Sequence, residues 1–116
     1  SIPEIGTIVA KHHPAVVLCL EPFGKPDDPP LRSQANGSMA VQSAAMAGLQ
    51  LMQAAHAEGI GSVWTCSPLF SAHIFRSVLK LPETWVPQAL ILLGFPAEKP
   101  AAADRLPAGT TIRMIE

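Results

Sequence analysis

The sequence predicts an α/β (α+β) fold in which a long apolar helix packs on a mixed sheet of few strands. Two continuous, mostly aliphatic runs, at residues 15–20 and 88–96, are typical of strands buried on both faces. Segments with helical spacing of apolar residues alternate with these runs. Such alternation favours helices packed on a mixed or parallel sheet.

The chain opens with a predicted short helix at residues 3–11, because Pro3 suits a first helical turn. Two adjacent histidines, His12 and His13, follow. Neighbouring side chains point to different faces of a helix or strand, so this pair does not predict a metal site. After the first strand, residues 22–36 are predicted to form a mobile loop, since proline, glycine and aspartate dominate its first part.

The central helix is predicted over residues 38–58, with Asn36 or Ser38 as its cap. Apolar residues occupy nearly its whole circumference, which is typical of a helix buried on all sides. Gly59 is placed for a left-handed C-terminal cap. We interpret His56, in the last turn, as a helix-end cation or a satisfied core group rather than a catalyst.

A strand is predicted over residues 62–66, and Ser71 is the expected cap of a helix over residues 72–80. The second aliphatic run, at 88–96, then gives a buried strand. Residues 97–116 are expected to form a C-terminal arm, in which residues 110–115 are either a short strand or extended. We expect residues 1–116 to form one domain that lacks the N-terminal part of its fold.

Composition narrows the classes of function. Hydrophobic residues make up 48% of the chain and charged residues 15%, which suggests that a second copy or another segment covers apolar surface. A net charge of −1 without a basic run argues against nucleic acid. Glutamines in the central helix argue against a membrane span, and no secretory signal precedes the first strand. We expect a cytoplasmic protein with two free, buried thiols, Cys19 and Cys66; a disulfide between them is the alternative.

No motif for covalent or metal catalysis is present. The sequence lacks a Ser-His-Asp elbow, a phosphate-binding P-loop, zinc-ligand spacing and a dinucleotide glycine fingerprint. Cys66 is the candidate nucleophile, but no base is fixed beside it by sequence. A pocket with few titratable groups fits a bound cofactor that carries its own chemistry.

Several segments, in order, resemble the nitroreductase family. The match comprises residues 39–43 and 51–61 of the helix, residues 64–70 at the strand end, and residues 81–88 and 93–97 further on. Together they cover about residues 12–107. Within the family, the chain is most similar to the branch that resembles the C-terminal domain of the coenzyme F420 γ-glutamyl ligase.

The resemblance implies an FMN-dependent oxidoreductase, with hydride from a nicotinamide cofactor and flavin bound at the interface of a homodimer. By resemblance, Cys66, Ser67, Pro68 and Leu69 would lie beside the flavin ring, where backbone N–H groups hydrogen-bond its N5 and O4 edge. Arg105 resembles a basic residue that meets the FMN phosphate, and Lys99 is a second choice.

The chain also departs from the family pattern. The Arg-Arg-Ser type segment that grips phosphate, and the Pro-Ser-x-x-Asn-x-Gln-Pro type segment that contacts ribityl and ring, do not occur. Where relatives often carry Gln-Asn, this helix has Leu49-Gln50. The sequence therefore leaves open FMN, F420 or no cofactor. The alternative function is a non-catalytic dimerising or binding module that keeps the fold without the flavin site.

Overall fold

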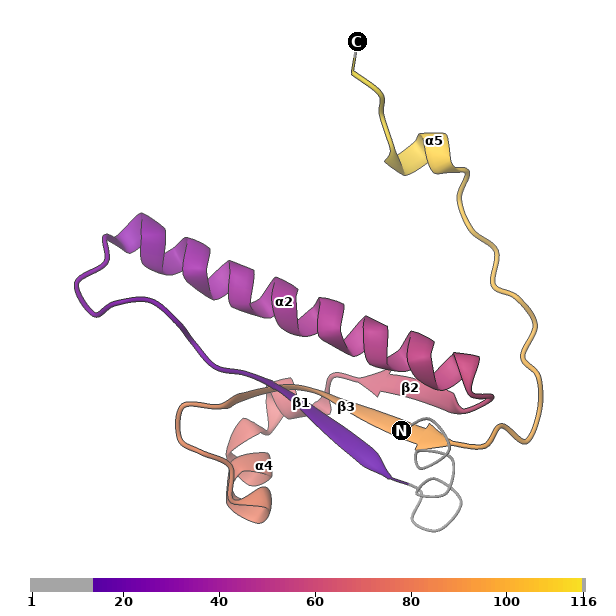
Figure 1. Cartoon of the computed structure of the whole chain (residues 1–116), viewed down its shortest axis with the longest axis horizontal. Coiled ribbons are helices and arrows are strands. Elements are labelled where there is room, and N and C mark those ends of the chain that lie inside the picture. The colour runs from indigo at the N-terminus through magenta and orange to yellow at the C-terminus, as the bar shows by residue number, and fades with distance from the viewer. Residues whose placement is uncertain (1–13, 116) are drawn as a thin grey trace.

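The computed structural model describes residues 14–115, and the predicted N-terminal helix and the His12-His13 pair lie outside them. A three-stranded sheet carries a long helix on one side and two short helices on the other (Figure 1). The predicted α/β class is confirmed. The elements are β1 (Ala15–Leu20), α2 (Pro30–Ala57), β2 (Gly61–Thr65), α3 (Ser67–Phe70), α4 (Ala72–Leu79), β3 (Val86–Gly94) and α5 (Ala108–Thr111).

The direction of strand pairing differs from the prediction. The sheet order is β1-β3-β2, and both pairs are antiparallel. The crossover through α2 makes β1 and β2 run in the same direction, as the alternating pattern suggests. However, β3 lies between them and runs the opposite way. The expected mixed or parallel sheet is therefore wrong for the described residues, since each ladder present is antiparallel.

Only one of the two aliphatic runs is a middle strand. β3 has neighbours on both sides, and its Ala89 and Ile91 are fully buried. β1 lies at an edge of the three-stranded sheet, and none of its residues is fully buried. Its register with β3 shifts between Leu18 and Cys19, as at a β-bulge. An unbroken apolar run therefore does not distinguish a central strand from an edge strand here.

The long helix begins at Pro30, eight positions before the predicted start at 38. Proline has no N–H to lose at a first helical position, and its fixed φ suits the helix there. The loop is correspondingly shorter, and its Asp28 carboxylate accepts bonds from the Lys25 N–H at 2.8 Å and the Asn36 amide at 3.4 Å. Asn36 and Ser38 lie inside the helix and do not cap it.

The end of α2 is as predicted. Gly59 has a φ of +76°, in the left-handed region that glycine adopts without strain. Its N–H donates to the His56 carbonyl at 2.9 Å, and the Ile60 N–H donates to the Ala55 carbonyl at 2.9 Å. This is the bonding pattern of a Schellman cap, and Ala55 and Ile60 also pack together in the core.

α2 lies against the sheet along one stripe of small residues. Ala40, Ala44, Gly48 and Ala55 are the buried residues of the helix. A Cβ on Gly48 would come within 3.0 Å of Leu18 and closer still to the Trp64 ring, so both side chains pack into the space that glycine leaves. The prediction of burial on all sides is wrong for the described chain. The opposite side, here called the outer face of α2, is exposed at Leu31, Met39, Met46 and Leu49.

The other side of the sheet is only partly covered. α3 and α4 pack against β3, and α4 is positioned through the bond that Arg76 Nε donates to the Trp85 carbonyl at 3.0 Å. Beyond β3 the chain runs extended to α5, and residues 95–115 are all exposed (Figure 1). No strand forms at residues 110–115; α5 ends at Thr111 and Ile112 is extended.

The packing of the Trp64 ring against Gly48 gives a stability prediction. Gly48→Ala should lower the free energy of unfolding by about 1–3 kcal/mol, because the new methyl group overpacks the Trp64 ring. Gly37→Ala is the matched control, since it lies in the same helix with nothing within 4 Å of its added Cβ. It should raise stability by about 0.5–1 kcal/mol through helix propensity. Urea unfolding of both variants measures the difference, and equal effects would contradict this packing.

Candidate functional site

The candidate site is the junction of β2 and α3, where the predicted residues Cys66, Ser67, Pro68 and Leu69 are contiguous. β2 pairs with the middle strand β3 as far as Thr65, which lies opposite Leu90. The chain then turns at Cys66 and enters α3 at Ser67. A strand end beside a helix start is the usual position of ligands in layered α/β folds.

Pro68 anchors this junction. Its side chain is among the fully buried ones, and α3 packs against β3. The proline ring therefore faces the protein interior and presents no surface to a ligand. The Leu69 N–H donates to the Cys66 carbonyl at 3.0 Å, which closes the turn. Both interactions hold the exposed neighbours Cys66 and Ser67 in fixed positions.

The backbone donors of the junction are fewer than predicted. Proline at 68 has no N–H, and the Leu69 N–H is already donated within the turn. Ser67 opens α3, so its N–H has no partner inside that helix. Among Ser67, Pro68 and Leu69, the Ser67 N–H is the backbone donor that remains for a ligand.

Hydroxyl groups supply further polar atoms that sequence reasoning missed. The Thr65 and Ser67 hydroxyls lie 3.1 Å apart, and the Ser71 hydroxyl donates to the Ser67 carbonyl at 3.0 Å. The spacing of Thr65 and Ser67 on either side of Cys66 was the available signal. This spacing indicates a polar site only if the turn from strand to helix brings the two hydroxyls together, as it does in the structure.

Apolar surface lies next to these polar groups. Leu69 is 55% exposed and Phe70 is 87% exposed. Ligand sites combine a mostly apolar lining with a few placed polar groups. The junction therefore offers apolar surface at Leu69 and Phe70 and polar atoms at Thr65 and Ser67.

Arg105 is not brought to this junction within one chain. The arm leaves the sheet after Gly94, which pairs with Gly61 at the start of β2, whereas Cys66 follows the opposite end of that strand. Arg105 is exposed and lies on the arm between β3 and α5. The second choice, Lys99, lies closer to the start of the arm and is also remote from the junction.

A cavity of about 630 Å³ occupies the other end of β2. It lies between the end of α2 and the start of the arm, and its lining includes His56, Gly61, Ser62, Glu98 and Lys99. Its volume exceeds the concavities of about 320 and 230 Å³ beside the end of β1. The cavity of about 630 Å³ therefore does not coincide with the predicted site residues. We favour the junction as the candidate site, because the buried Pro68 holds its exposed polar atoms in place.

The cysteines differ in environment, and both are free. Cys66 is exposed and Cys19 is only half-buried, which corrects the prediction of two buried thiols; Cys66 follows the last strand residue and is not part of the ladder. Burial raises the pKa of the Cys19 thiol, and the Arg76 guanidinium opposes part of that rise. Among residues 14–115 no group of acidic, cysteine or histidine side chains could hold a metal ion.

Comparison with known families identifies the class. The model of the nitroreductase family matches residues 10–95, which include the helix, the three strands and the β2–α3 junction. The chain belongs to the nitroreductase family. The described part of the chain contains no helix long and apolar enough to cross a membrane.

Individual relatives agree with this assignment. A curated protein of Methanothermobacter thermautotrophicus named "Putative NADH dehydrogenase/NAD(P)H nitroreductase" is 35% identical over 66 residues, which cover 55% of this chain and 35% of the relative. A nitroreductase family protein from Streptococcus pneumoniae has a TM-score of 0.59 at 25% identity, covering 70% of this chain and 40% of its own. The chain thus spans well under half the length of either relative.

A further solved structure is an NADPH:FMN oxidoreductase from Vibrio harveyi in complex with NAD+. It is 25% identical to this chain, with a TM-score of 0.50, and the match covers 72% of this chain and 34% of that one. These neighbours confirm the α/β fold class.

The cysteine environments predict different reactivity. Iodoacetamide at pH 7.5 should modify Cys66 at least about threefold faster than Cys19, because Cys66 is exposed, whereas Cys19 is half-buried and burial raises the pKa of its thiol. Peptide mass spectrometry over a time course measures both rates. In Cys66→Ser only the slow reaction should remain. Equal rates would show that the junction is not exposed as described.

Proposed function

We propose that this chain forms part of an FMN-dependent NAD(P)H oxidoreductase of the nitroreductase type. The family match across the β2–α3 junction is the observation that carries the proposal. The Vibrio harveyi neighbour, an NADPH:FMN oxidoreductase, supports the same cofactors. Because the chain spans only part of its relatives, activity of the whole protein is inferred from them.

The junction residues fit the ring edge of a flavin. The Ser67 N–H and the paired hydroxyls of Thr65 and Ser67 provide hydrogen bonds to a polar edge, and Leu69 contributes apolar contact. The chemistry that bound FMN supplies is hydride transfer from a reduced nicotinamide and delivery of its electrons to an acceptor. A fixed N–H directed at the ring edge would stabilise negative charge on the reduced ring without reorganising.

The phosphate end is a separate part of the proposal. Arg105 offers a planar guanidinium, which suits a phosphate group through paired hydrogen bonds. Its place on the exposed arm means that the arm must be repositioned, or must come from another chain, for Arg105 and Cys66–Leu69 to bind one cofactor. Lys99 remains the second choice for this role.

The finer assignments are also proposals. The resemblance to the C-terminal domain of the F420 γ-glutamyl ligase makes F420 the alternative to FMN. We propose a homodimer, supported by the exposed outer face of α2. The two free cysteines support a reducing compartment such as the cytoplasm.

A non-catalytic dimerising module is the second candidate function. One observation favours it: Arg105 and the β2–α3 junction are not assembled in one chain. Such a module keeps the helix-on-sheet fold and associates through its apolar surface without binding flavin. The two candidates differ in a simple property, since only the first protein gains stability with a flavin.

Flavin binding is the first test. FMN added in excess should raise the melting temperature, because a ligand that binds only the folded state stabilises it by mass action. F420 and riboflavin are measured in parallel, and NADH or NADPH consumption is then followed with the flavin-loaded protein. No shift with millimolar FMN or F420 would reject the oxidoreductase proposal for this chain and leave the binding module.

Replacing Arg105 tests the phosphate contact. Arg105→Ala should weaken FMN binding by about tenfold or more, the cost of a lost charge-assisted hydrogen bond, while riboflavin binding, which involves no phosphate, stays unchanged. Isothermal titration with both ligands gives the comparison. Arg113→Ala removes the same charge from the same arm and should leave the FMN-to-riboflavin ratio as in the wild type. An unchanged ratio in Arg105→Ala would rule out this role.

A further inference from the structure

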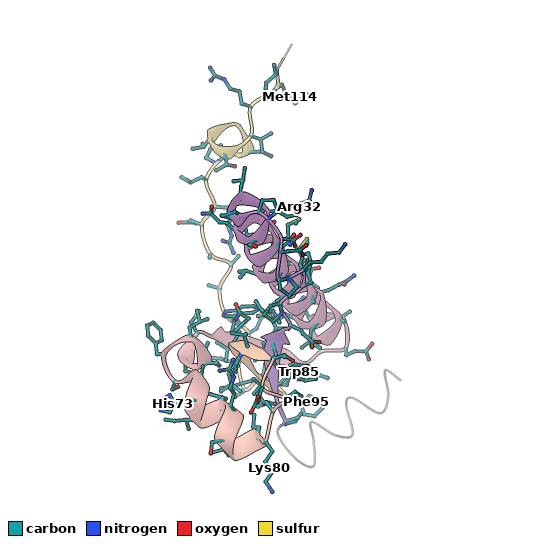
Figure 2. All side chains as sticks on the ribbon, turned by 90° about the vertical axis from the view of Figure 1, so that its left-hand side faces the viewer. Arg32, His73, Lys80, Trp85, Phe95 and Met114 are labelled. Atoms are coloured by element: carbon teal, nitrogen blue, oxygen red, sulfur yellow. The ribbon has the colours of Figure 1, made fainter. Side chains whose placement is uncertain are left out.

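The cavity at the start of β2 is separate from the β2–α3 junction. Its volume of about 630 Å³ is within the range of about 300–1,000 Å³ that small-molecule sites occupy. Figure 1 shows the three segments that meet there: the end of α2, the start of β2 and the chain that leaves β3. In Figure 2, Phe95 lies beside the sheet and Met114 at the far end of the arm, so only the first part of the arm takes part in the cavity.

Glycines keep this cavity open. Gly59 lines it, and a Cβ added there would meet nothing within 4 Å, so its backbone borders open space. A Cβ on Gly61 would lie 3.3 Å from the Gly94 carbonyl oxygen and 3.8 Å from the Pro96 Cβ. Glycine at position 61 therefore lets Pro96 approach the start of β2 closely. The cavity thus has accessible backbone on one side and a proline ring on the other.

Much of the lining is apolar. Ile60, which is 2% exposed, closes the cavity toward the core. Pro96, Ala97 and Pro100 line the side that the arm forms. An apolar ligand body that covers these side chains removes apolar surface from water, which favours binding. The lining therefore suits a small ligand with an apolar body.

The polar groups at the helix end favour a positive charge on that ligand. α2 is 28 residues long, and the negative end of its dipole lies at the cavity, between His56 and Gly59. The cap satisfies the carbonyls of Ala55 and His56, but within residues 14–115 no backbone N–H outside the helix donates to the Ala57 carbonyl. The Glu98 carboxylate also lines the cavity and adds a negative charge.

Lys99 is a lining residue that would favour an anion instead. Its residue is exposed, and its ammonium group is carried on a flexible stem, so the charge can remain in water while the stem covers apolar surface. The carbonyl groups at the helix end cannot turn away in this manner. The fixed partial charges at the cavity are therefore negative, whereas the Ser62 hydroxyl can hydrogen-bond to a ligand of either charge.

We propose that this cavity is a second binding site, which takes a small organic cation: a primary amine or guanidinium group carried on an apolar body. The charged end binds at the carbonyl end of α2 beside Glu98, and the apolar body packs on Ile60 and Pro96. The site does not depend on flavin, on the β2–α3 junction or on a second copy of the chain.

Three probes that share one apolar body test the preference for a cation. They are 2-phenylethylamine, the neutral 2-phenylethanol and the anion 3-phenylpropanoate. In NMR titrations of the full chain, the amine should bind with a millimolar dissociation constant, at least about fivefold tighter than the alcohol. The backbone amide signals of residues 59–62 should shift, and those of residues 66–69 should not. Equal affinities for all three probes, tighter binding of the anion, or no binding of the amine would overturn the proposal.

Two pairs of variants test where the amine binds. Glu98→Gln should reduce the preference for amine over alcohol by about threefold or more, because the carboxylate charge is lost. Glu83→Gln, which removes an exposed carboxylate outside the cavity lining, is the matched control and should keep the preference. Ala97→Trp should abolish binding of the amine by filling the cavity, whereas Ala101→Trp, on the same arm but outside the lining, should not.

Circular dichroism confirms that each variant is folded. Wild-type affinity for the amine in Ala97→Trp would show that the cavity is not the site and would overturn the proposal. An unchanged preference in Glu98→Gln would overturn the pairing of the cation with this carboxylate. Both measurements use the chain without flavin, so they are independent of the melting-temperature test for FMN.

Discussion

The close approach of α2 to the sheet depends on Gly48, because the Trp64 ring occupies the space where a side chain would stand. Trp64 lies in β2, one residue before Thr65 and two before Cys66. The same contact therefore fixes the strand that leads into the β2–α3 junction. Ala40, Ala44 and Ala55 are the other buried residues of the helix, and their small side chains allow α2 to lie close to the sheet along its length. The packing of α2 on the sheet therefore also positions the strand that leads to the candidate site.

Local patterns in the sequence predict the elements well and their long-range pairing poorly. The strands, the helix end at Gly59 and the helix after Ser71 follow from residue type and spacing, but the Ser71 hydroxyl donates to the Ser67 carbonyl and does not cap that helix as predicted. Strand direction does not, because β3 reaches its place between β1 and β2 through contacts that no local pattern encodes. The start of α2 differs from the predicted residue 38, because Pro29 and Pro30 resemble loop residues although the fixed φ of Pro30 suits a first helical position.

The candidate site divides in the same way. Cys66 to Leu69 are contiguous, so their grouping was predictable from the chain alone. The buried position of Pro68 and the contact between the Thr65 and Ser67 hydroxyls depend on how α3 turns back onto β3. The placement of Arg105 depends on the path of the whole arm, and it is the relation that residue spacing is least able to predict.

The central position of β3 also has a consequence for biosynthesis. A ribosome delivers β1, α2 and β2 first, and these have no ladder with one another because β3 separates them. Until residue 94 has left the exit tunnel, β1 and β2 have exposed edges, because β3, the strand that pairs with both, is not yet available. Since unpaired strand edges favour aggregation, the edges of β1 and β2 that β3 covers in the fold are open to aggregation until β3 has been synthesised.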